Sequence, residues 1–396
     1  MTARHEVGVE IEGKRLTLSN LDKVFYPATG TTKGQVLDYY IRIAPALLPH
    51  LRDRPLTLKR YPNGAQGAFF YEKRCPSHRP AWVRTEAVRS ESKGDVIHFC
   101  VVDDLATLVW AANLADLEMH TYLHRAPAVD RPTMLVFDLD PGPPAGALEC
   151  CEVALLVRAL FDRLGLSSFP KTSGSKGVQV YVPLNSPAGY DATKAFARAV
   201  AERLEAERPD LVVSSMKKAL REGKVLVDWS QNDVHKTTVC AWSLRAKERP
   251  TVSTPVRWTE IESALRARDG SRLVFDARAA LARFERDGDP FAPVLTLAQT
   301  LPGPGRLRGA ARTTSGAAPP PPTRAEARRH EPPRQAGSGR RPAQPPTARE
   351  KGSATGRRAP TGRRGGRSPA RRARARRTPP PGDGQRAPGD AYLCTT

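Results

Sequence analysis

The chain has 396 residues, of which 39% are hydrophobic and 6% aromatic, and its formal net charge is +22. Residues 301–396 hold 22 basic and 5 acidic residues, so residues 1–300, with 41 basic and 36 acidic residues, are nearly balanced. The global charge therefore does not by itself identify a nucleic-acid partner. No apolar stretch approaches the roughly 20 residues that span a bilayer, which excludes a membrane-spanning protein, and we expect no membrane partner.

The N-terminal residues 1–13 alternate charged with short apolar side chains, and we expect no secretory signal in them. The six cysteines show neither a CxxC pair nor a regular spacing; they are Cys75, Cys100, Cys150, Cys151, Cys240 and Cys394. Both observations favour a reducing, cytoplasmic compartment.

Helical and strand patterns are mixed along residues 1–300. Thr32 can cap a helix, because apolar side chains recur at three- and four-residue steps from Val36 to Leu47. Further helices are predicted over 103–118 and 147–164, and strands over 55–60, 134–138, 178–184 and 225–229. Elements of this number without a repeat predict an α+β or α/β body of one or two lobes.

The last segment, residues 301–396, contains 17 of the 37 prolines and several arginine clusters. Because it has few large apolar residues, burial cannot offset the entropy of ordering it, and we predict a long disordered C-terminal tail. Two interpretations stay open. The tail is either a basic arm that binds a phosphate backbone, or a solvated extension without a role, even one translated past a lost stop codon.

Acidic side chains end two of the predicted strands. Residues two apart on a strand point to the same side, so Asp138 and Asp140 present two carboxylates together. Asp228 ends another apolar strand. Three such carboxylates can hold two divalent cations, Mg²⁺ or Mn²⁺, and predict nucleotidyl transfer. A turn at Asp140-Pro141-Gly142 and a strand-end cap at Asp228 are the alternatives.

The loop 172–177, TSGSKG, has small residues that let backbone N–H groups approach phosphate oxygens, while Lys176 adds a positive charge. It leads into a strand, whereas a P-loop leads into a helix, so it is not a P-loop. A plain surface turn is the alternative.

Polar residues also gather after Asp228, where either phosphate and sugar binding or a polar surface loop explains them: Asn232, His235, Lys236, Thr237 and Arg245.

Two weaker features follow the first predicted strand. Phe69 and Phe70 stand beside cationic residues, which suits base stacking, although core packing explains them equally well. Cys75 and His78 are zinc-type ligands, but no second pair follows at finger spacing.

Together these motifs resemble the polymerase domain of bacterial ligase D, a branch of the archaeo-eukaryotic primase-polymerase superfamily that acts in non-homologous end joining. The likeness rests on FDLDPG at 137–142, TSGSKG at 172–177 and VDWSQNDVHKTT at 227–238, with further matches at 18–24, 26–30 and 105–110. It implies a primase-polymerase fold over residues 1–300, with mixed central sheets flanked by helices. It also implies a nucleoid-associated location, a preference for ribonucleotides and Mn²⁺ as the favoured metal.

The resemblance implies roles for individual residues. Asp138, Asp140 and Asp228 match the catalytic, metal-binding aspartates. The incoming NTP or dNTP is expected near Ser173, Lys176, Gln179, His120, Arg245, Lys59 and Arg60. The 5′-phosphate of a DNA end is expected at Asn20, Lys23 and Lys33, and the template base is expected to stack on Phe69 or Phe70.

Two departures from the family pattern matter. The second motif usually ends SGSKG-x-His, and Gln179 stands in place of that histidine. Glutamine donates a hydrogen bond but cannot become cationic, so it stabilises less transition-state charge. No Lys-x-Asp-Gly adenylation motif occurs in the chain, so we expect it to rely on a separate ATP-dependent DNA ligase and on the Ku end-binding protein.

We therefore predict a template-dependent DNA/RNA polymerase that adds nucleotides to primer 3′ ends at gaps and double-strand breaks. The main alternative is a DNA-end-binding scaffold with weak or no polymerase activity, in which Lys23 and Lys33 matter more than the aspartates. A second alternative is a phosphatase, because Asp-Leu-Asp after an apolar strand resembles the haloacid-dehalogenase signature, although Pro141 stands where that signature has Thr or Val.

Overall fold

A computed structural model describes residues 6–89, 94–303 and 306–307. The chain divides into a compact unit, Met1–Ser315, and a second unit, Gly316–Thr396. Nearly all of the predicted tail lies outside the described residues, so its disorder and the boundary at residue 300 stay predictions.

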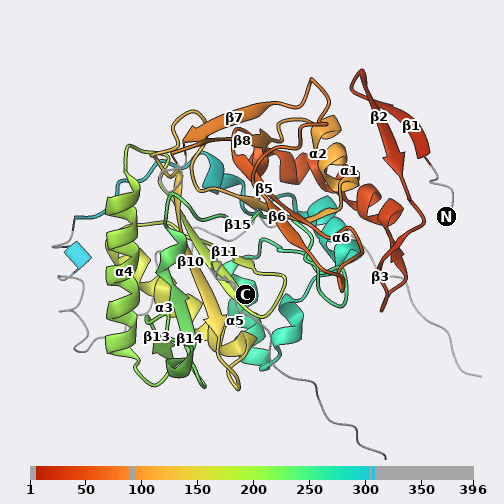
Figure 1. The fold of residues 1–396 in the computed structure, drawn as a ribbon. Coiled ribbons are helices and arrows are strands. Elements are labelled where there is room, and N and C mark those ends of the chain that lie inside the picture. The colour runs from red at the N-terminus through yellow and green to blue at the C-terminus, as the bar shows by residue number, and fades with distance from the viewer. Residues whose placement is uncertain (1–5, 90–93, 304–305, 308–396) are drawn as a thin grey trace, which may run out of the picture. The chain divides into compact units, whose positions relative to one another are not determined.

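The first sheet has the strand order β15-β9-β5-β8-β7, and β6 pairs with β5 off this path. Its strands are β5 (Pro55–Arg60), β6 (Phe70–Glu72), β7 (Thr85–Arg89), β8 (Val96–Val101), β9 (Asp116–Thr121) and β15 (Thr238–Val239). The helices in this part of the molecule are α1 (Lys33–Leu51), α2 (Leu105–Asn113) and α6 (Ala277–Asp287) (Figure 1). Two small antiparallel pairs precede it, namely β1 (Glu6–Ile11) with β2 (Lys14–Ser19) and β3 (Val24–Tyr26) with β4 (Thr31–Thr32).

The second sheet has the order β11-β12-β10-β14-β13, antiparallel except between β13 and β14. Its strands are β10 (Met134–Pro141), β11 (Phe169–Thr172), β12 (Val178–Pro183), β13 (Val212–Val213) and β14 (Val225–Asp228). Around it lie α3 (Ala147–Leu164), α4 (Tyr190–Glu207) and α5 (Trp258–Ala267). Short 3-10 helices are η1 (Lys218–Leu220), η2 (Trp229–Gln231), η3 (Gly270–Leu273) and η4 (Ala292–Leu295).

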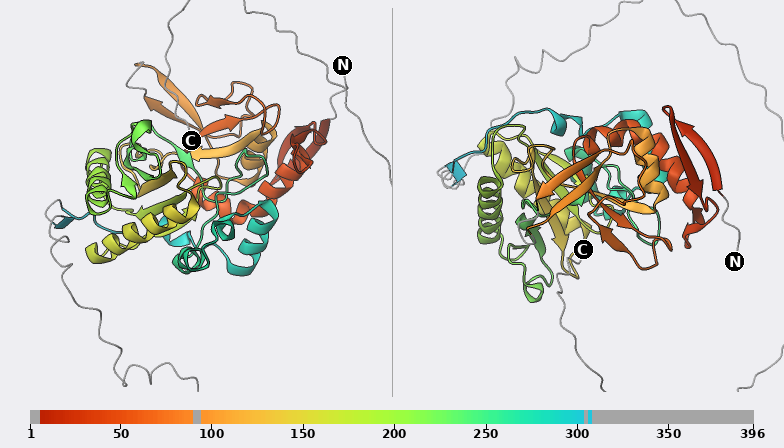
Figure 2. Two further views of the ribbon diagram at one scale, coloured as in Figure 1. Left: turned by 90° about the horizontal axis from the view of Figure 1, so that it is seen from below. Right: turned by 45° about the horizontal axis from the view of Figure 1, so that its top comes forward.

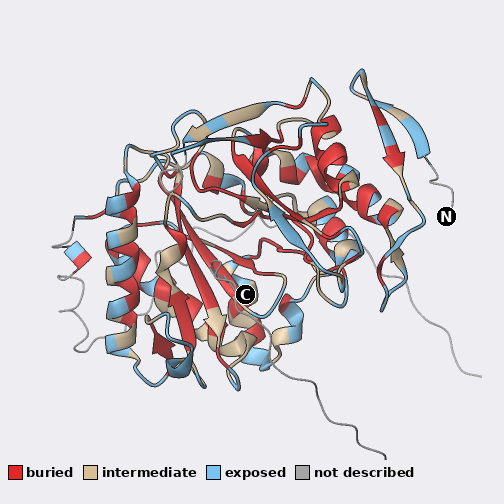
Figure 3. Cartoon of the chain, viewed as in Figure 1, coloured by how far each residue is buried: buried red, intermediate tan, exposed pale blue. Residues whose placement is uncertain are grey.

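Strand β10 separates two hydrophobic cores. Leu135, Phe137 and Leu139 pack in the core that α3 and α4 share, whereas Met134 and Val136 belong to the core of the first sheet. Figure 2 shows the two groups of strands side by side, and Figure 3 shows β10 buried along most of its length. Because alternate residues face opposite sides, Asp138 and Asp140 point with Met134 and Val136 toward the first sheet.

Most predicted elements are confirmed. Helix α1 follows Thr32, whose side chain accepts a hydrogen bond from the Gln35 N–H in a capping box, and α3 and β5 have the predicted bounds. The helix predicted over 103–118 is wrong beyond Asn113. Ala115 has a φ of 65°, which ends the helical path, and residues 116–121 form β9.

A disulfide joins Cys75, just after β6, to Cys100 of β8, which the cysteine spacing does not predict. It removes Cys75 as a zinc ligand, so the zinc alternative is wrong. Cys150, Cys151 and Cys240 are buried free thiols.

No helix in the described part of the chain is long and apolar enough to cross a membrane.

Candidate active site

Three aspartates lie on the face of the second sheet that points toward the first. Asp138 of β10 is the register partner of Asp228 of β14, and Asp140 lies two residues further along β10. Opposed side chains of antiparallel strands stand about 5 Å apart. The register thus places side chains from the ends of two strands, far apart in the sequence, on one face of the sheet.

The negative charges of these aspartates are poorly balanced. Burial, followed by the charges of Asp140 and Asp228, raises the pKa of Asp138 to about 7. Burial and the charge of Asp228 raise the pKa of Asp140, although Arg221 opposes them. Such a set of oxygen donors fits a hard divalent cation, which would remove the repulsion.

The three carboxylates do not form a complete metal coordination sphere. No group of three or more His, Cys, Asp or Glu side chains in the described ranges is close enough to hold an ion. Asp228 instead accepts hydrogen bonds from the N–H and hydroxyl of Ser230, at 2.9 and 2.6 Å, and from the amide of Gln231. Since like charges repel and this carboxylate has other partners, the metal site stays a prediction supported by its donor set.

The acidic row continues across the sheet to Gln179 and Lys171. Gln179 of β12 opposes Asp138, and Lys171 of β11 opposes Gln179. The Lys171 ammonium is fully buried and donates to the Ser253 hydroxyl at 2.5 Å. Burial lowers its pKa to about 7, while the charge of Asp138 opposes that shift. Lys171 is not among the predicted site residues, although it lies two residues before Ser173 and therefore on the same face of the strand.

The TSGSKG loop is held in a tight conformation. The Ser173 hydroxyl accepts hydrogen bonds from the N–H groups of Ser175 and Gly177, at 3.2 and 3.1 Å. Gly174 has a φ of +66°, and a Cβ there would lie 2.7 Å from the carbonyl carbon of Val252, so only glycine fits. Lys176 is exposed and its charge acts on Asp140. The loop can therefore offer an ordered backbone and a lysine to an anion beside the aspartates.

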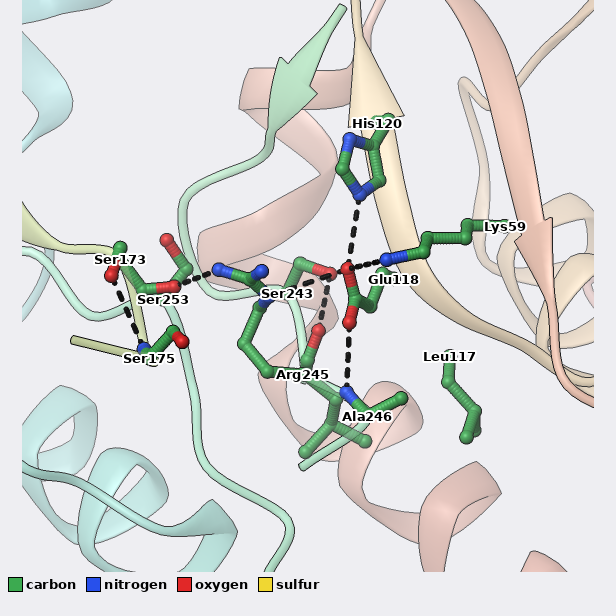
Figure 4. A network of polar contacts seen from close by, with 12 residues as sticks. Lys59, Leu117, Glu118, His120, Ser173, Ser175, Ser243, Arg245, Ala246 and Ser253 are labelled. Carbon is green, nitrogen blue, oxygen red and sulfur yellow. Dashed lines mark hydrogen bonds and ion pairs between the residues drawn. The ribbon is translucent and has the colours of Figure 1, made fainter. Parts of the chain in front are cut away.

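Opposite the loop, three predicted nucleotide-binding residues converge on one buried carboxylate, that of Glu118 (Figure 4). The ammonium of Lys59, the Nε2 of His120 and the Nε of Arg245 lie 3.0, 3.1 and 3.3 Å from Glu118 Oε2. Arg245 also donates to the backbone carbonyl of Ser173 and so links the two sheets. Glu118 is not among the predicted site residues, because the helix predicted over 103–118 would not place its side chain opposite Lys59.

The predicted 5′-phosphate residues form a basic patch at the start of α1. Lys33 is buried and donates to the Ser19 carbonyl at 2.7 Å, and Lys23 donates to the Pro62 carbonyl at 2.7 Å. Burial, followed by the charges of Lys23 and Arg60, lowers the pKa of Lys33 to about 8. Exposed Asn20 begins the turn toward Lys23, with a φ of 55°.

The aromatic residues of β6 and its approach lie on the surface. Phe69, Phe70 and Tyr71 are 50%, 45% and 47% exposed, so the core-packing alternative is wrong. The Lys59 ammonium lies 4.6 Å from the Phe69 ring centre, and the Arg60 guanidinium lies 5.2 Å from that of Phe70. These rings offer flat faces beside cations, as base stacking requires.

The polar residues that follow Asp228 make contacts with different parts of the protein. The Asn232 amide donates to the Val136 carbonyl at 2.7 Å and accepts from the Val136 N–H at 2.9 Å, so it fastens the loop to β10. Lys236 donates to the Ser230 hydroxyl. Arg245 reaches the Glu118 group described above.

The comparisons with known proteins agree on one family. The model described as LigD, primase-polymerase domain, matches residues 32–291. The multifunctional non-homologous end joining protein LigD of Mycolicibacterium smegmatis is 42% identical over 295 residues, covering 74% of this chain and 37% of that protein. The bifunctional non-homologous end joining protein LigD of Bacillus subtilis is 32% identical over 278 residues, covering 70% of this chain and 44% of that protein. The chain thus spans less than half the length of these relatives.

A solved structure gives the same result. The polymerase domain from Mycobacterium tuberculosis ligase D, in complex with DNA, superposes with a TM-score of 0.67 at 40% identity. The match covers 72% of this chain and 99% of that one.

Proposed function

This chain belongs to the LigD primase-polymerase family, and on that premise we propose that it is a template-dependent polymerase that adds nucleotides to primer 3′ ends at DNA gaps and double-strand breaks. The observation that carries the proposal is the pairing of Asp138 with Asp228 and the place of Asp140 on the same face, where burial and the two neighbouring carboxylates raise the pKa of Asp138. Membership of this family removes the ground for the phosphatase alternative.

Asp138, Asp140 and Asp228 are the residues that would hold two Mg²⁺ or Mn²⁺ ions. Bound there, the cations would supply activation of the primer 3′-hydroxyl and charge neutralisation on the nucleotide. The protein's own part is to hold the carboxylates on rigid, buried strands, and Gln179 assists by donating to Asp138.

The incoming nucleotide is proposed to bind between the TSGSKG loop and the Glu118 group. The loop orients the triphosphate with its N–H groups and Lys176, while Lys59, Arg60, His120 and Arg245 supply cations and donors from the first sheet. Because little covalent chemistry falls to the protein, rate enhancement comes from positioning and charge stabilisation.

The broken DNA end is proposed to bind along the first sheet. Asn20, Lys23 and Lys33 grip its 5′-phosphate, and Phe69 or Phe70 stacks on the template. We further propose that the protein works in the nucleoid with Ku and an ATP-dependent DNA ligase.

Primer extension on a gapped duplex with a 5′-phosphate tests the proposal, run with NTPs or dNTPs and with Mn²⁺ or Mg²⁺. We expect the wild type to extend the primer and Asp138→Ala to fail while still binding the duplex. Full extension by Asp138→Ala would overturn the assignment.

One observation favours the end-binding alternative. Gln179 is buried in the acidic row and donates to Thr238 at 3.4 Å, so this position holds no cation in this chain. A wild-type protein that binds phosphorylated ends tightly and extends none of them with any metal would establish the scaffold function.

A further inference from the structure

Glu118 is a buried carboxylate on strand β9 of the first sheet. It is 1% exposed and opposes Lys59 in the β5–β9 register, so the two side chains share one face of the first sheet. His120, two residues along β9, shares that face as well. The strand pairing therefore directs these three side chains to one point.

Both oxygens of the Glu118 carboxylate are occupied. Oε2 faces Lys59, His120 and Arg245, while Oε1 accepts hydrogen bonds from the Tyr61 hydroxyl at 3.3 Å and the Ala246 N–H at 3.0 Å. A carboxylate with this many donors has a single arrangement, and its rotation would break several contacts at once.

The contacts of Glu118 also reach the second sheet. Arg245 donates to the Ser173 carbonyl, and Ser173 in turn orders the TSGSKG loop. Lys59 and Arg245 are cations that would repel each other without an anion between them. Glu118 thus connects residues of β5 and β9 with the loop that faces them (Figure 4).

We propose that Glu118 is a positioning residue for the incoming nucleotide: it aligns Lys59, His120 and Arg245 and fixes the TSGSKG loop through Arg245. The inference rests on the proposed function. Glu118 itself touches no substrate, because both of its carboxylate oxygens already bind protein groups. Its loss would act on nucleotide binding more than on the aspartate chemistry.

The test compares Glu118→Gln with Glu260→Gln in the full chain. Glu260 forms an ion pair with buried Arg283 between α5 and α6, so its variant also loses a partner of a buried arginine, away from the site. On the gapped duplex we expect Glu118→Gln to raise the nucleotide KM at least about tenfold, the size of a lost charge-assisted hydrogen bond, with a smaller change in kcat. Glu260→Gln should leave KM within about twofold of the wild type at a temperature where it is folded.

Two further variants keep the test decisive if Glu118→Gln folds poorly. Glu118→Asp keeps the charge on a shorter side chain and should recover part of the nucleotide affinity. In a Lys59→Met background, Glu118→Gln should cost less than in the wild type, because the two residues act together.

The outcomes separate this inference from the proposed function. If the wild type extends primers and the folded Glu118→Gln variant keeps the wild-type KM, the positioning role is wrong and the polymerase assignment stands. A change in melting temperature alone, or equal KM changes in Glu118→Gln and Glu260→Gln, would also overturn it. A wild type that does not extend primers overturns the proposed function first.

Discussion

Two buried carboxylate sites face each other across this molecule, and their charges are handled in opposite ways. Asp138 on the second sheet is surrounded by other acids, and burial with their charge raises its pKa to about 7. Burial also acts to raise the pKa of Glu118 on the first sheet, but His120, Arg245 and Lys59 outweigh it and hold that pKa well below its usual range. Burial therefore does not decide the charge of a carboxylate; its partners do.

The difference assigns the two sides of the site to different ligands. An acidic row in which three carboxylates share one buried ammonium, that of Lys171, attracts metal ions, whereas a single acid among cations leaves net positive charge for phosphates. A polymerase needs both surfaces, one for the cations and one for the triphosphate. Substitutions that remove the acidic side chains and substitutions that remove the cationic ones should therefore cause different defects.

The largest effect is expected at the acidic row. Asp138→Ala should lower the rate of primer extension by at least about a thousandfold, because metal-dependent charge stabilisation worth several kcal/mol is lost. Binding of the gapped duplex, measured by fluorescence anisotropy, should stay near the wild-type value. Weak duplex binding would mean that Asp138 serves the fold or the DNA site instead.

A second prediction concerns stability, where the two sites should respond with opposite signs. Glu118→Gln should destabilise the protein by about 3–5 kcal/mol, because it leaves buried cations without their anion. Asp138→Asn should stabilise the metal-free protein at pH 8 by up to about 4 kcal/mol, since each unit of raised pKa corresponds to about 1.4 kcal/mol. Urea unfolding with a chelator present measures both.

The pH dependence of stability tests the raised pKa of Asp138. Its pKa is raised from 3.8 to about 7 on folding, so the folded state is penalised fully above pH 7 and not below the unfolded pKa of 3.8. The advantage of Asp138→Asn should therefore be larger at pH 8 than at pH 5. An equal advantage at both values would contradict the raised pKa.

The sequence predicts the features that depend on interactions between neighbouring residues, and it does not predict those that join distant segments. Helix α1 with its Thr32 cap, and the strands that end in Asp138 and Asp228, depend on local patterns and are found from them. The registers that make Asp138 oppose Asp228 and Lys59 oppose Glu118 join segments far apart in the chain, and no local pattern encodes them. The same holds for the Cys75–Cys100 bond.

Glu118 shows why a site residue escapes a sequence reading. The apolar run of α2 continues with helical spacing past Asn113, and a left-handed residue, Ala115, ends it without a glycine or proline to mark the change. The alternation of polar and apolar residues from Asp116 to His120 was the available signal, but five residues of it are weak against the longer helical pattern.

A third, smaller effect should appear at the basic patch. The pKa of Lys33 is lowered to about 8, so its ammonium is largely lost by pH 9 and the preference for a 5′-phosphorylated end should fall up to about tenfold between pH 7 and pH 9. Lys33→Met should show a weak preference at every pH in the same binding assay. If the wild type keeps its preference to pH 9, Lys33 does not bind the phosphate as a free ammonium.

The smallest effect is expected from Gln179→His, which restores the residue usual in the family's second motif. Gln179 lies on the row between Asp138 and Lys171, so a cation is already buried next to it. A protonated imidazole would add little further charge beside that ammonium, and we expect extension to be unchanged or raised by about threefold, the size of a weak hydrogen-bond contribution. Single-turnover extension at saturating nucleotide measures it. A large loss would instead mean that the glutamine amide, through its contacts with Asp138 and Thr238, has a role that a histidine cannot fill.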